Sequence, residues 1–185
     1  MPEIMRRPIV RKIFNVIRSS AELERLIPEL PDKECYKIIS GGDFSSISFI
    51  RFVGVKTKIK ELTVSTLRVG KKELQYLDLM AKNGRIGTAT FVVGSIMKKD
   101  SKKGLSYGYY DNFENVCNKN KWRYCISNNH SKLILMDTDK GKYVLETSSN
   151  LNENPKIEQF SFEKDSNLYD FYHNFLSELV RCGNG

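Results

Sequence analysis

The strongest constraint in this sequence is a pair of short polar motifs on either side of a predicted β-hairpin. His130 and Lys132 lead into an alternating apolar run that ends at Asp137, and residues 147–150 (Thr-Ser-Ser-Asn) follow the next run. Residues 138–142 (Thr-Asp-Lys-Gly-Lys) have the composition of a hairpin turn, so the two runs are predicted to pair as antiparallel strands. The hairpin therefore brings two groups of polar residues into one part of the fold.

These motifs contain residue types that suit an anion. Lys132 supplies a fixed positive charge, and His130 supplies a ring nitrogen that can attack or carry a proton near neutral pH. We expect both on one face of an extended strand, because side chains two residues apart point the same way. Ser148 adds a hydroxyl and Asn150 a carboxamide, which suit the remaining oxygens of a tetrahedral anion such as phosphate.

The order of these residues resembles the signature of the phospholipase D superfamily, His-x-Lys-x4-Asp followed by Gly-Ser-x-Asn. The matching residues are His130, Lys132, Asp137, Ser148 and Asn150. The resemblance covers the last third of the chain closely. It implies an α/β fold, a phospholipase D-like mixed sheet flanked by helices.

The chain departs from this signature at two points. Thr147 stands where the family has Gly, and a β-branched residue cannot adopt the backbone angles that Gly can. The gap after Asp137 is longer than in the family, and its extra residues fall in the predicted hairpin turn. The strands can therefore lengthen without moving the motifs.

The resemblance also implies a chemistry that needs no metal and no cofactor. One His forms a phosphohistidine, while a second His protonates the leaving oxygen and later activates water. Asp137 is implied to be structural. Glu158 is implied to hydrogen-bond His130 and orient its ring, and the alternative is that Glu158 is a solvent-facing strand residue.

A single copy of the motif implies a homodimer. The other histidine, His173, lies in a predicted helix with no Lys two residues later, so we interpret it as structural. A second copy of the chain would then supply the second imidazole of the site. Single-motif members of the superfamily are commonly nucleases, which implies a phosphodiesterase acting on DNA or RNA. The alternatives are a nucleic-acid-binding module that has lost turnover, and a phosphodiesterase for lipid head groups or a small nucleotide.

The charge distribution favours a polyanionic partner. The chain has 30 Lys and Arg against 22 Asp and Glu, a net charge of +8. Residues 1–123 carry 24 basic and 13 acidic side chains, whereas residues 124–185 carry 6 and 9. A broad basic surface can hold nucleic acid. A basic loop is expected to contact phosphate, with an ordinary surface loop as the alternative; its candidate residues are Lys98, Lys99, Lys102 and Lys103.

The chain is predicted to consist of an N-terminal helical extension (1–31) and, as the resemblance implies, a phospholipase D-like domain (32–185). Residues 4–18 are predicted to form a helix with an apolar stripe, followed by a short helix from Ser20. The other predicted strands lie at 36–39, 62–67, 86–93, 122–126, 130–136, 142–146 and 157–162. The other predicted helices lie at 47–55, 71–80, 111–119 and 166–181.

Targeting and metal signals do not appear in the sequence. No apolar run approaches the roughly eighteen residues needed to span a bilayer, and residues 1–18 lack the apolar core and cleavage site of a secretory signal. The 4 cysteines include no C-x-x-C pair, which predicts neither a zinc site nor a disulfide framework. We therefore expect a cytoplasmic protein with no metal and no membrane partner.

Overall fold

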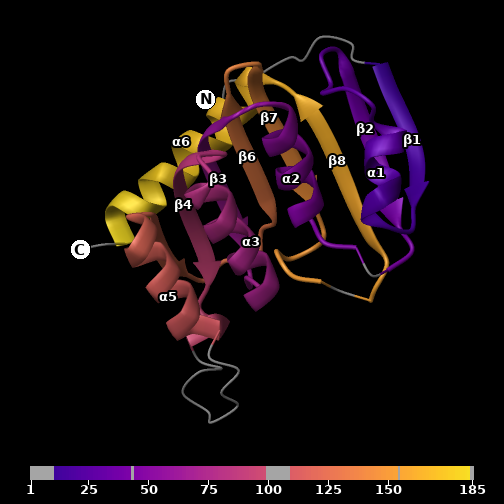
Figure 1. Cartoon of the computed structure of the whole chain (residues 1–185). Coiled ribbons are helices and arrows are strands. Elements are labelled where there is room, and N and C mark those ends of the chain that lie inside the picture. Colours follow the sequence, from indigo (N-terminus) through magenta and orange to yellow (C-terminus); the bar gives the residue numbers. More distant parts are fainter. Residues whose placement is uncertain (1–10, 43, 99–108, 154, 184–185) are drawn as a thin grey trace, which may run out of the picture.

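A single mixed β-sheet organises the chain (Figure 1). The computed structural model describes residues 11–42, 44–98, 109–153 and 155–183. The strands lie in the order β1-β2-β8-β7-β6-β3-β4-β5. Their bounds are β1 (Arg11–Ile17), β2 (Glu34–Ser40), β3 (Ile59–Thr66), β4 (Ile86–Gly94), β5 (Arg123–Ser127), β6 (Leu133–Thr138), β7 (Gly141–Thr147) and β8 (Glu158–Lys164).

Helices flank both faces of this sheet (Figure 1). They are α1 (Ser20–Leu26), α2 (Ile47–Lys56), α3 (Lys71–Lys82), α5 (Tyr109–Asn120) and α6 (Ser166–Gly183). The first four cover one face, and α6 packs on the opposite face against β3, β4, β5 and β7. The predicted α/β class, a mixed sheet flanked by helices, is confirmed.

An antiparallel block interrupts an otherwise parallel sheet. β1 pairs parallel with β2, and β3, β4 and β5 pair parallel with one another. Between these groups, β8, β7 and β6 pair antiparallel with their neighbours. The parallel pairing of β3 with β4 confirms the predicted βαβ order, but β2 and β3 are separated by the three inserted strands.

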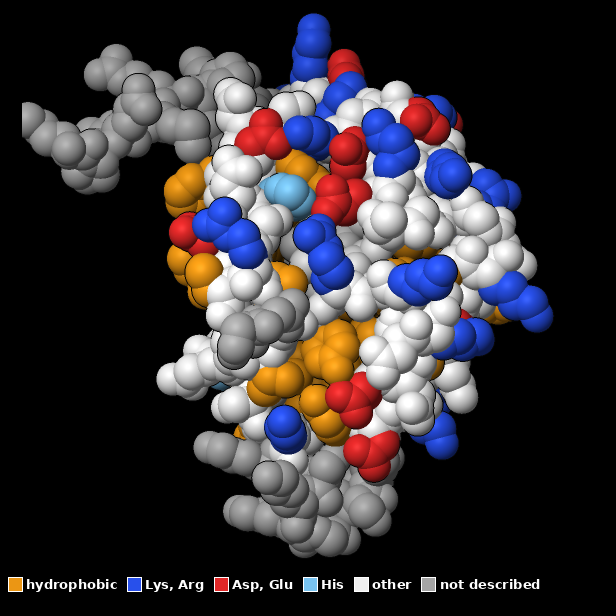
Figure 2. All heavy atoms as spheres, turned by 90° about the vertical axis from the view of Figure 1, so that its left-hand side faces the viewer, with side chains coloured by type: hydrophobic (Ala, Val, Ile, Leu, Met, Phe, Trp, Pro, Cys, Tyr) orange, Lys and Arg blue, Asp and Glu red, His pale blue; other side chains and the backbone are white. Residues whose placement is uncertain are grey.

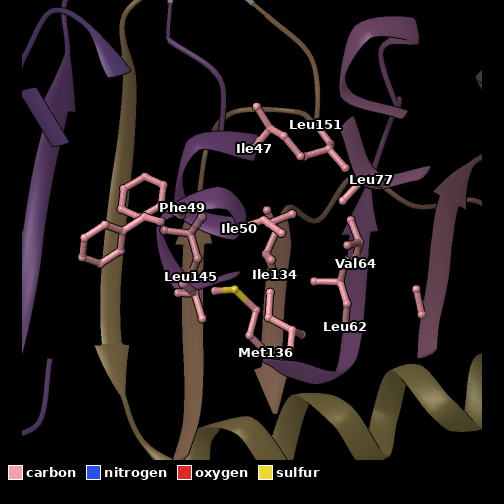
Figure 3. Packing of buried hydrophobic residues seen from close by; sticks show 14 of the residues in the cluster. Ile47, Phe49, Ile50, Leu62, Val64, Leu77, Ile134, Met136, Leu145 and Leu151 are labelled. Atoms are coloured by element: carbon pink, nitrogen blue, oxygen red, sulfur yellow. The ribbon is translucent and has the colours of Figure 1, made fainter. Parts of the chain in front are cut away.

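The central strands are apolar on both sides because helices cover both faces. In β6, Ile134 and Met136 point into the core under α2 and α3, as Figure 3 shows. Leu135, between them, points to the opposite face and joins the smaller core under α6, with Tyr169 and Leu176. The alternation along one strand therefore supplies both cores.

A glycine closes the predicted β6–β7 hairpin. Gly141 has φ +131, and a Cβ there would lie 2.5 Å from Cε of Lys164. Thr138 donates a side-chain hydrogen bond of 2.8 Å to the carbonyl of Gly141. Only glycine fits this backbone without strain, so the turn and the register of the hairpin are set by the same residue.

The helix predicted over residues 4–18 is wrong for residues 11–17, which form strand β1. Apolar residues at 13, 14, 16 and 17 fit a helical stripe, but the run pairs with β2 along its whole length. Ile17 is buried, whereas Phe14 and Val16 point to solvent. The short helix from Ser20 is confirmed as α1. The division at residue 31 stays a prediction, although β1 joins the sheet formed by the later residues.

Charged side chains cover much of the face shown in Figure 2, where Lys and Arg are spread out with Asp and Glu between several of them. The positive charge on this face is therefore dispersed over the surface. None of the described helices is long and apolar enough to span a bilayer.

Asp78 joins α3 to α5 and provides a test of this packing. Asn120 Nδ2 and Lys119 Nζ donate to its carboxylate at 2.7 and 2.6 Å. These two hydrogen bonds, Asn120 first, hold the pKa of Asp78 below its ordinary value. A depressed pKa contributes stability above the unfolded value of about 4, and that stability is lost as the pH falls through the folded pKa.

We therefore predict that Asp78→Asn lowers the free energy of unfolding by about 1 kcal/mol at pH 7. The difference from wild type should shrink as the pH falls below about 4. Urea denaturation at both pH values measures this. The exposed Glu24→Gln in α1 is the control and should change stability little; an Asp78 effect that persists at low pH would contradict the assignment.

Candidate active site

The two motifs meet at one edge of the sheet, the side formed by the ends of its strands, because the hairpin reverses the chain. β6 begins, β7 ends and β8 begins at this edge, where β7 pairs with both neighbours. The backbone N–H of Thr147 donates to the carbonyl of Lys132 at 3.2 Å, which joins the motifs directly. His130 and Lys132 lie just before β6, so the prediction that they occupy the strand itself is corrected by its start at Leu133.

His130 and Lys132 lie side by side at this edge. Lys132 Nζ is 2.9 Å from His130 Nδ1 and donates to the carbonyl of His130 at 2.6 Å. His130 is exposed and Lys132 is half-buried. An ammonium donates but cannot accept, so Nδ1 is the acceptor and the neutral ring carries its proton on Nε2.

Glu158 connects the second motif to the ammonium of the first. Its buried carboxylate accepts a hydrogen bond from the hydroxyl of Ser148. Burial lowers the pKa of Lys132, and the negative charge of Glu158 opposes that shift. Because the opposite charge favours the ammonium, Glu158 keeps Lys132 suited to holding an anion. The interpretation of Glu158 as a solvent-facing residue is wrong, since only 9% of it is exposed.

Ser148 and Thr147 hold β7 to β8 and shape the turn after β7. Ser148 Oγ accepts from the backbone N–H of Gln159 at 3.0 Å, while the hydroxyl proton goes to Glu158. Thr147 is the last residue of β7, and its Oγ1 accepts from the N–H of Ser149 at 2.9 Å. Thr147 has no positive φ, so a β-branched residue in place of the family's Gly fits here without strain.

Asn150 places an unsatisfied oxygen near the same edge. Its Oδ1 is buried and has no hydrogen-bond partner in the described chain. Its backbone carbonyl accepts from Ser46 Oγ at 3.3 Å and from the N–H of Asn152 at 2.8 Å, which anchors the segment to the start of α2. A buried acceptor without a donor is costly, and a donor arriving with a ligand would satisfy it.

Asp137 and His173 lie away from this edge. Asp137 is near the far end of β6 and forms an ion pair of 3.4 Å with Lys60. His173 lies on α6, with Nε2 3.2 Å from Glu61 Oε1 and its ring stacked on Tyr169 at 5.4 Å. The interpretation of both as structural residues stays a prediction.

The basic loop can be described only at its start. Lys98 follows β4 and is exposed, and its ammonium lies 5.6 Å from the ring centroid of Tyr110. Lys99, Lys102 and Lys103 lie outside the described residues. Their contact with phosphate stays a prediction.

Asn129 is a site residue that the sequence reasoning missed. Its Nδ2 donates to Ser65 Oγ at 3.0 Å and to the carbonyls of Val92 and Thr66 at 2.9 and 3.2 Å. Its Oδ1 accepts from the backbone N–H and the hydroxyl of Ser131 at 2.9 and 2.8 Å. One carboxamide thus ties the loop that carries His130 and Lys132 to the ends of β3 and β4.

Gly94 allows this loop to lie close to β4. A Cβ at Gly94 would be 3.0 Å from the carbonyl oxygen of Asn129 and 2.8 Å from that of Leu67. A glycine ending an apolar strand, together with an Asn just before the motif, was the available signal. It is weak, because many Asn residues in loops only cap turns.

In the ranges that the structure describes, no cluster of three or more His, Cys, Asp or Glu side chains could hold a metal ion.

Comparisons with known proteins identify the fold alone. No protein-family model matches the chain, and no curated protein matches it. A polyphosphate kinase from Porphyromonas gingivalis has a similar structure, with a TM-score of 0.61 and 16% identity over 86% of this chain and 29% of its own. A phosphatidylserine synthase from Haemophilus influenzae Rd KW20 gives 0.55 and 16% over 80% and 39%. The chain thus spans less than half of either protein, and the expected phospholipase D-like fold is confirmed.

The role of Asn129 can be tested without an activity assay. Asn129→Ala removes one hydrogen-bond partner from each of two carbonyls, two hydroxyls and the backbone N–H of Ser131. We therefore predict a loss of about 1–3 kcal/mol in the free energy of unfolding. Hydrogen exchange of the amides at residues 129–132 should accelerate. Asn128→Ala, an exposed neighbour, is the matched control and should stay within about 0.5 kcal/mol of wild type. Equal effects of the two substitutions would refute this role.

Proposed function

We propose that this chain is a metal-independent phosphodiesterase, a nuclease that works through a phosphohistidine on His130 in a homodimeric site. The observation that carries this proposal is the exposed His130–Lys132 pair, whose ammonium lies within the field of the buried Glu158. A nucleophile, a fixed cation and an acidic partner stand together at one edge of the sheet.

In the first step, His130 Nε2 attacks the phosphorus and forms a P–N bond as the P–O bond to the leaving group breaks. The partner's His130, protonated on both ring nitrogens, donates its Nε2 proton to the departing oxygen and becomes neutral. Lys132 turns from His130 Nδ1 to a phosphate oxygen, so Nδ1 of the attacking ring becomes free to carry the proton. The two rings of the dimer thus act in different protonation states: the attacking ring is neutral and the partner's ring is an imidazolium.

In the second step, the partner's His130 removes a proton from water, and the oxygen attacks the phosphohistidine. The P–N bond breaks, and the electron pair returns to His130 Nε2. The products are a phosphate monoester and the starting enzyme, with the proton restored to the partner's ring. Lys132 offsets the negative charge of the phosphoryl group in both steps, and the Nδ2 amide of Asn150 would donate to a phosphoryl oxygen.

The fold supports this class of chemistry. The two proteins of similar structure are a kinase named for polyphosphate and a synthase named for phosphatidylserine, so the fold is compatible with reactions at phosphate groups. The basic balance of residues 1–123 favours nucleic acid as the phosphodiester. Lys98, Lys99, Lys102 and Lys103 would contact its backbone.

The decisive experiment compares the two histidines of the chain. We predict that wild type cleaves labelled single-stranded DNA or RNA with excess chelator present. His130→Ala should reduce the rate at least about a thousandfold, because it removes the nucleophile and the acid together. His173→Gln, the matched control, should keep the rate within about twofold of wild type. Quenching in base and mass spectrometry should find the phosphoryl adduct on His130.

Each opposite outcome contradicts the proposal. Cleavage that requires added metal, or that survives His130→Ala, would exclude the phosphohistidine route. Salt-sensitive binding without cleavage, unchanged by His130→Ala, would identify a binding module that has lost turnover. Cleavage of a lipid head group or a small nucleotide alone would exclude a nuclease.

A further inference from the structure

The sheet face that carries α6 is covered over only part of its width. α6 packs on β3, β4, β5 and β7, and Figure 1 shows it behind that side of the sheet. On β1 and β2 the same face exposes large apolar side chains. Phe14 is 73% exposed, Val16 67% and Ile39 52%. Three such side chains on adjacent strands are a contiguous apolar surface, which soluble proteins seldom leave uncovered.

This surface is the floor of a cavity of about 820 Å³, which we call the open groove. The strand register places Phe14 beside Lys37, Lys37 beside Ser161, and Ser161 beside Glu146. The open groove therefore crosses β1, β2, β8 and β7. Lys132 also lines it, so the groove opens onto the candidate active site.

The other exposed apolar surface of this face lies on α6. Phe171 and Phe175 are 55% and 60% exposed and are one helical turn apart, so they form a ridge. The ring of Phe171 lies 5.2 Å from that of Tyr172, whose hydroxyl donates to Glu146 at the border of the open groove. The ridge and the groove are thus neighbours on one face of the sheet.

We propose that the open groove receives the phenylalanine ridge of α6 from a second copy of this chain. The inference rests on the homodimeric site proposed above and names the surfaces that form it. A two-fold axis parallel to the strands, through the middle of this face, exchanges its two halves. The ridge of each copy then covers the open groove of the other, giving two identical contacts.

The same axis completes the active site. β7 and β6 are the fourth and fifth of the eight strands, so the axis passes beside the segment that carries His130. The two imidazoles therefore approach each other when the ridges enter the grooves. One arrangement thus brings the apolar surfaces together and places the two imidazoles near the axis.

Two charged groups of the open groove already have a hydrogen-bond partner. Lys37 Nζ donates to Ser161 Oγ at 2.6 Å, and Glu146 accepts from Tyr172. Covering them would not leave these two charged groups without a hydrogen bond. The ridge is also electrically balanced near its end, where Arg181 lies 3.7 Å from Glu178.

Sedimentation equilibrium of the full chain tests the proposal. Phe175→Asp alters the ridge and Ile39→Asp alters the groove, and each introduces a carboxylate into both contacts of the dimer. We expect each to raise the dimer Kd at least about tenfold. Val55→Asp on α2, 71% exposed on the opposite face, is the matched control and should leave the Kd unchanged. Thermal melts check that all three variants remain folded.

A mixture of the two variants identifies the pairing. A heterodimer of Phe175→Asp and Ile39→Asp keeps one native ridge-in-groove contact, whereas each variant alone keeps none. We expect the mixture to dimerise more tightly than either component. A monomeric wild type, or a Kd unchanged in both variants, would overturn the proposal. So would loss of oligonucleotide binding with the dimer intact, which would make the groove a substrate channel.

Sedimentation measures assembly and the nuclease assay measures cleavage, so the two proposals can be tested separately. His130→Ala should abolish cleavage and leave the dimer intact. Dimerisation through these surfaces without cleavage of any phosphodiester would support this inference and contradict the proposed nuclease activity. If the protein cleaves the substrate and its dimer Kd is unchanged by Phe175→Asp and by Ile39→Asp, only this inference is contradicted.

Discussion

Everything at the candidate site depends on the backbone pairing that inserts the β6–β7 hairpin into the middle of the sheet. β6 pairs with β3 and β7 with β8, both antiparallel. This reversal brings the start of β6 and the end of β7 to the edge where the parallel strands end. Helices bury both faces of the middle of β6, so its polar side chains gather at the strand ends. The position of the site follows from that burial.

Hydrogen bonds then join the chain segments that meet at this edge. Asn129 holds the His130 loop to β3 and β4, while Ser148 holds β7 to the carboxylate of Glu158. Lys132 lies between the two, bonded to His130 and exposed to the charge of Glu158. The cation and the imidazole are therefore positioned before a ligand arrives, which reduces the cost of ordering them on binding.

Much of this arrangement could be predicted from local pattern. The continuous apolar runs that became β4 and β6, and the Gly141 turn, need only the chain near them to be interpreted. The motif containing His130 and Lys132 led to the correct fold. By contrast, residues 11–17 fit a helical and an extended pattern equally well, and only pairing with β2 decided for a strand. Asn129 was missed because its partners lie on β3 and β4.

The sequence by itself determined the strands after β1, the helices, the hairpin and the residue types that suit a phosphate, because periodicity, turn chemistry and side-chain chemistry act over a few neighbouring residues. Only the tertiary structure decided that β8, β7 and β6 separate β2 from β3, that Glu158 is buried against Ser148, and that half of one sheet face stays open beside Lys132. Those features depend on contacts between segments far apart in the chain, whose relative positions no local pattern encodes.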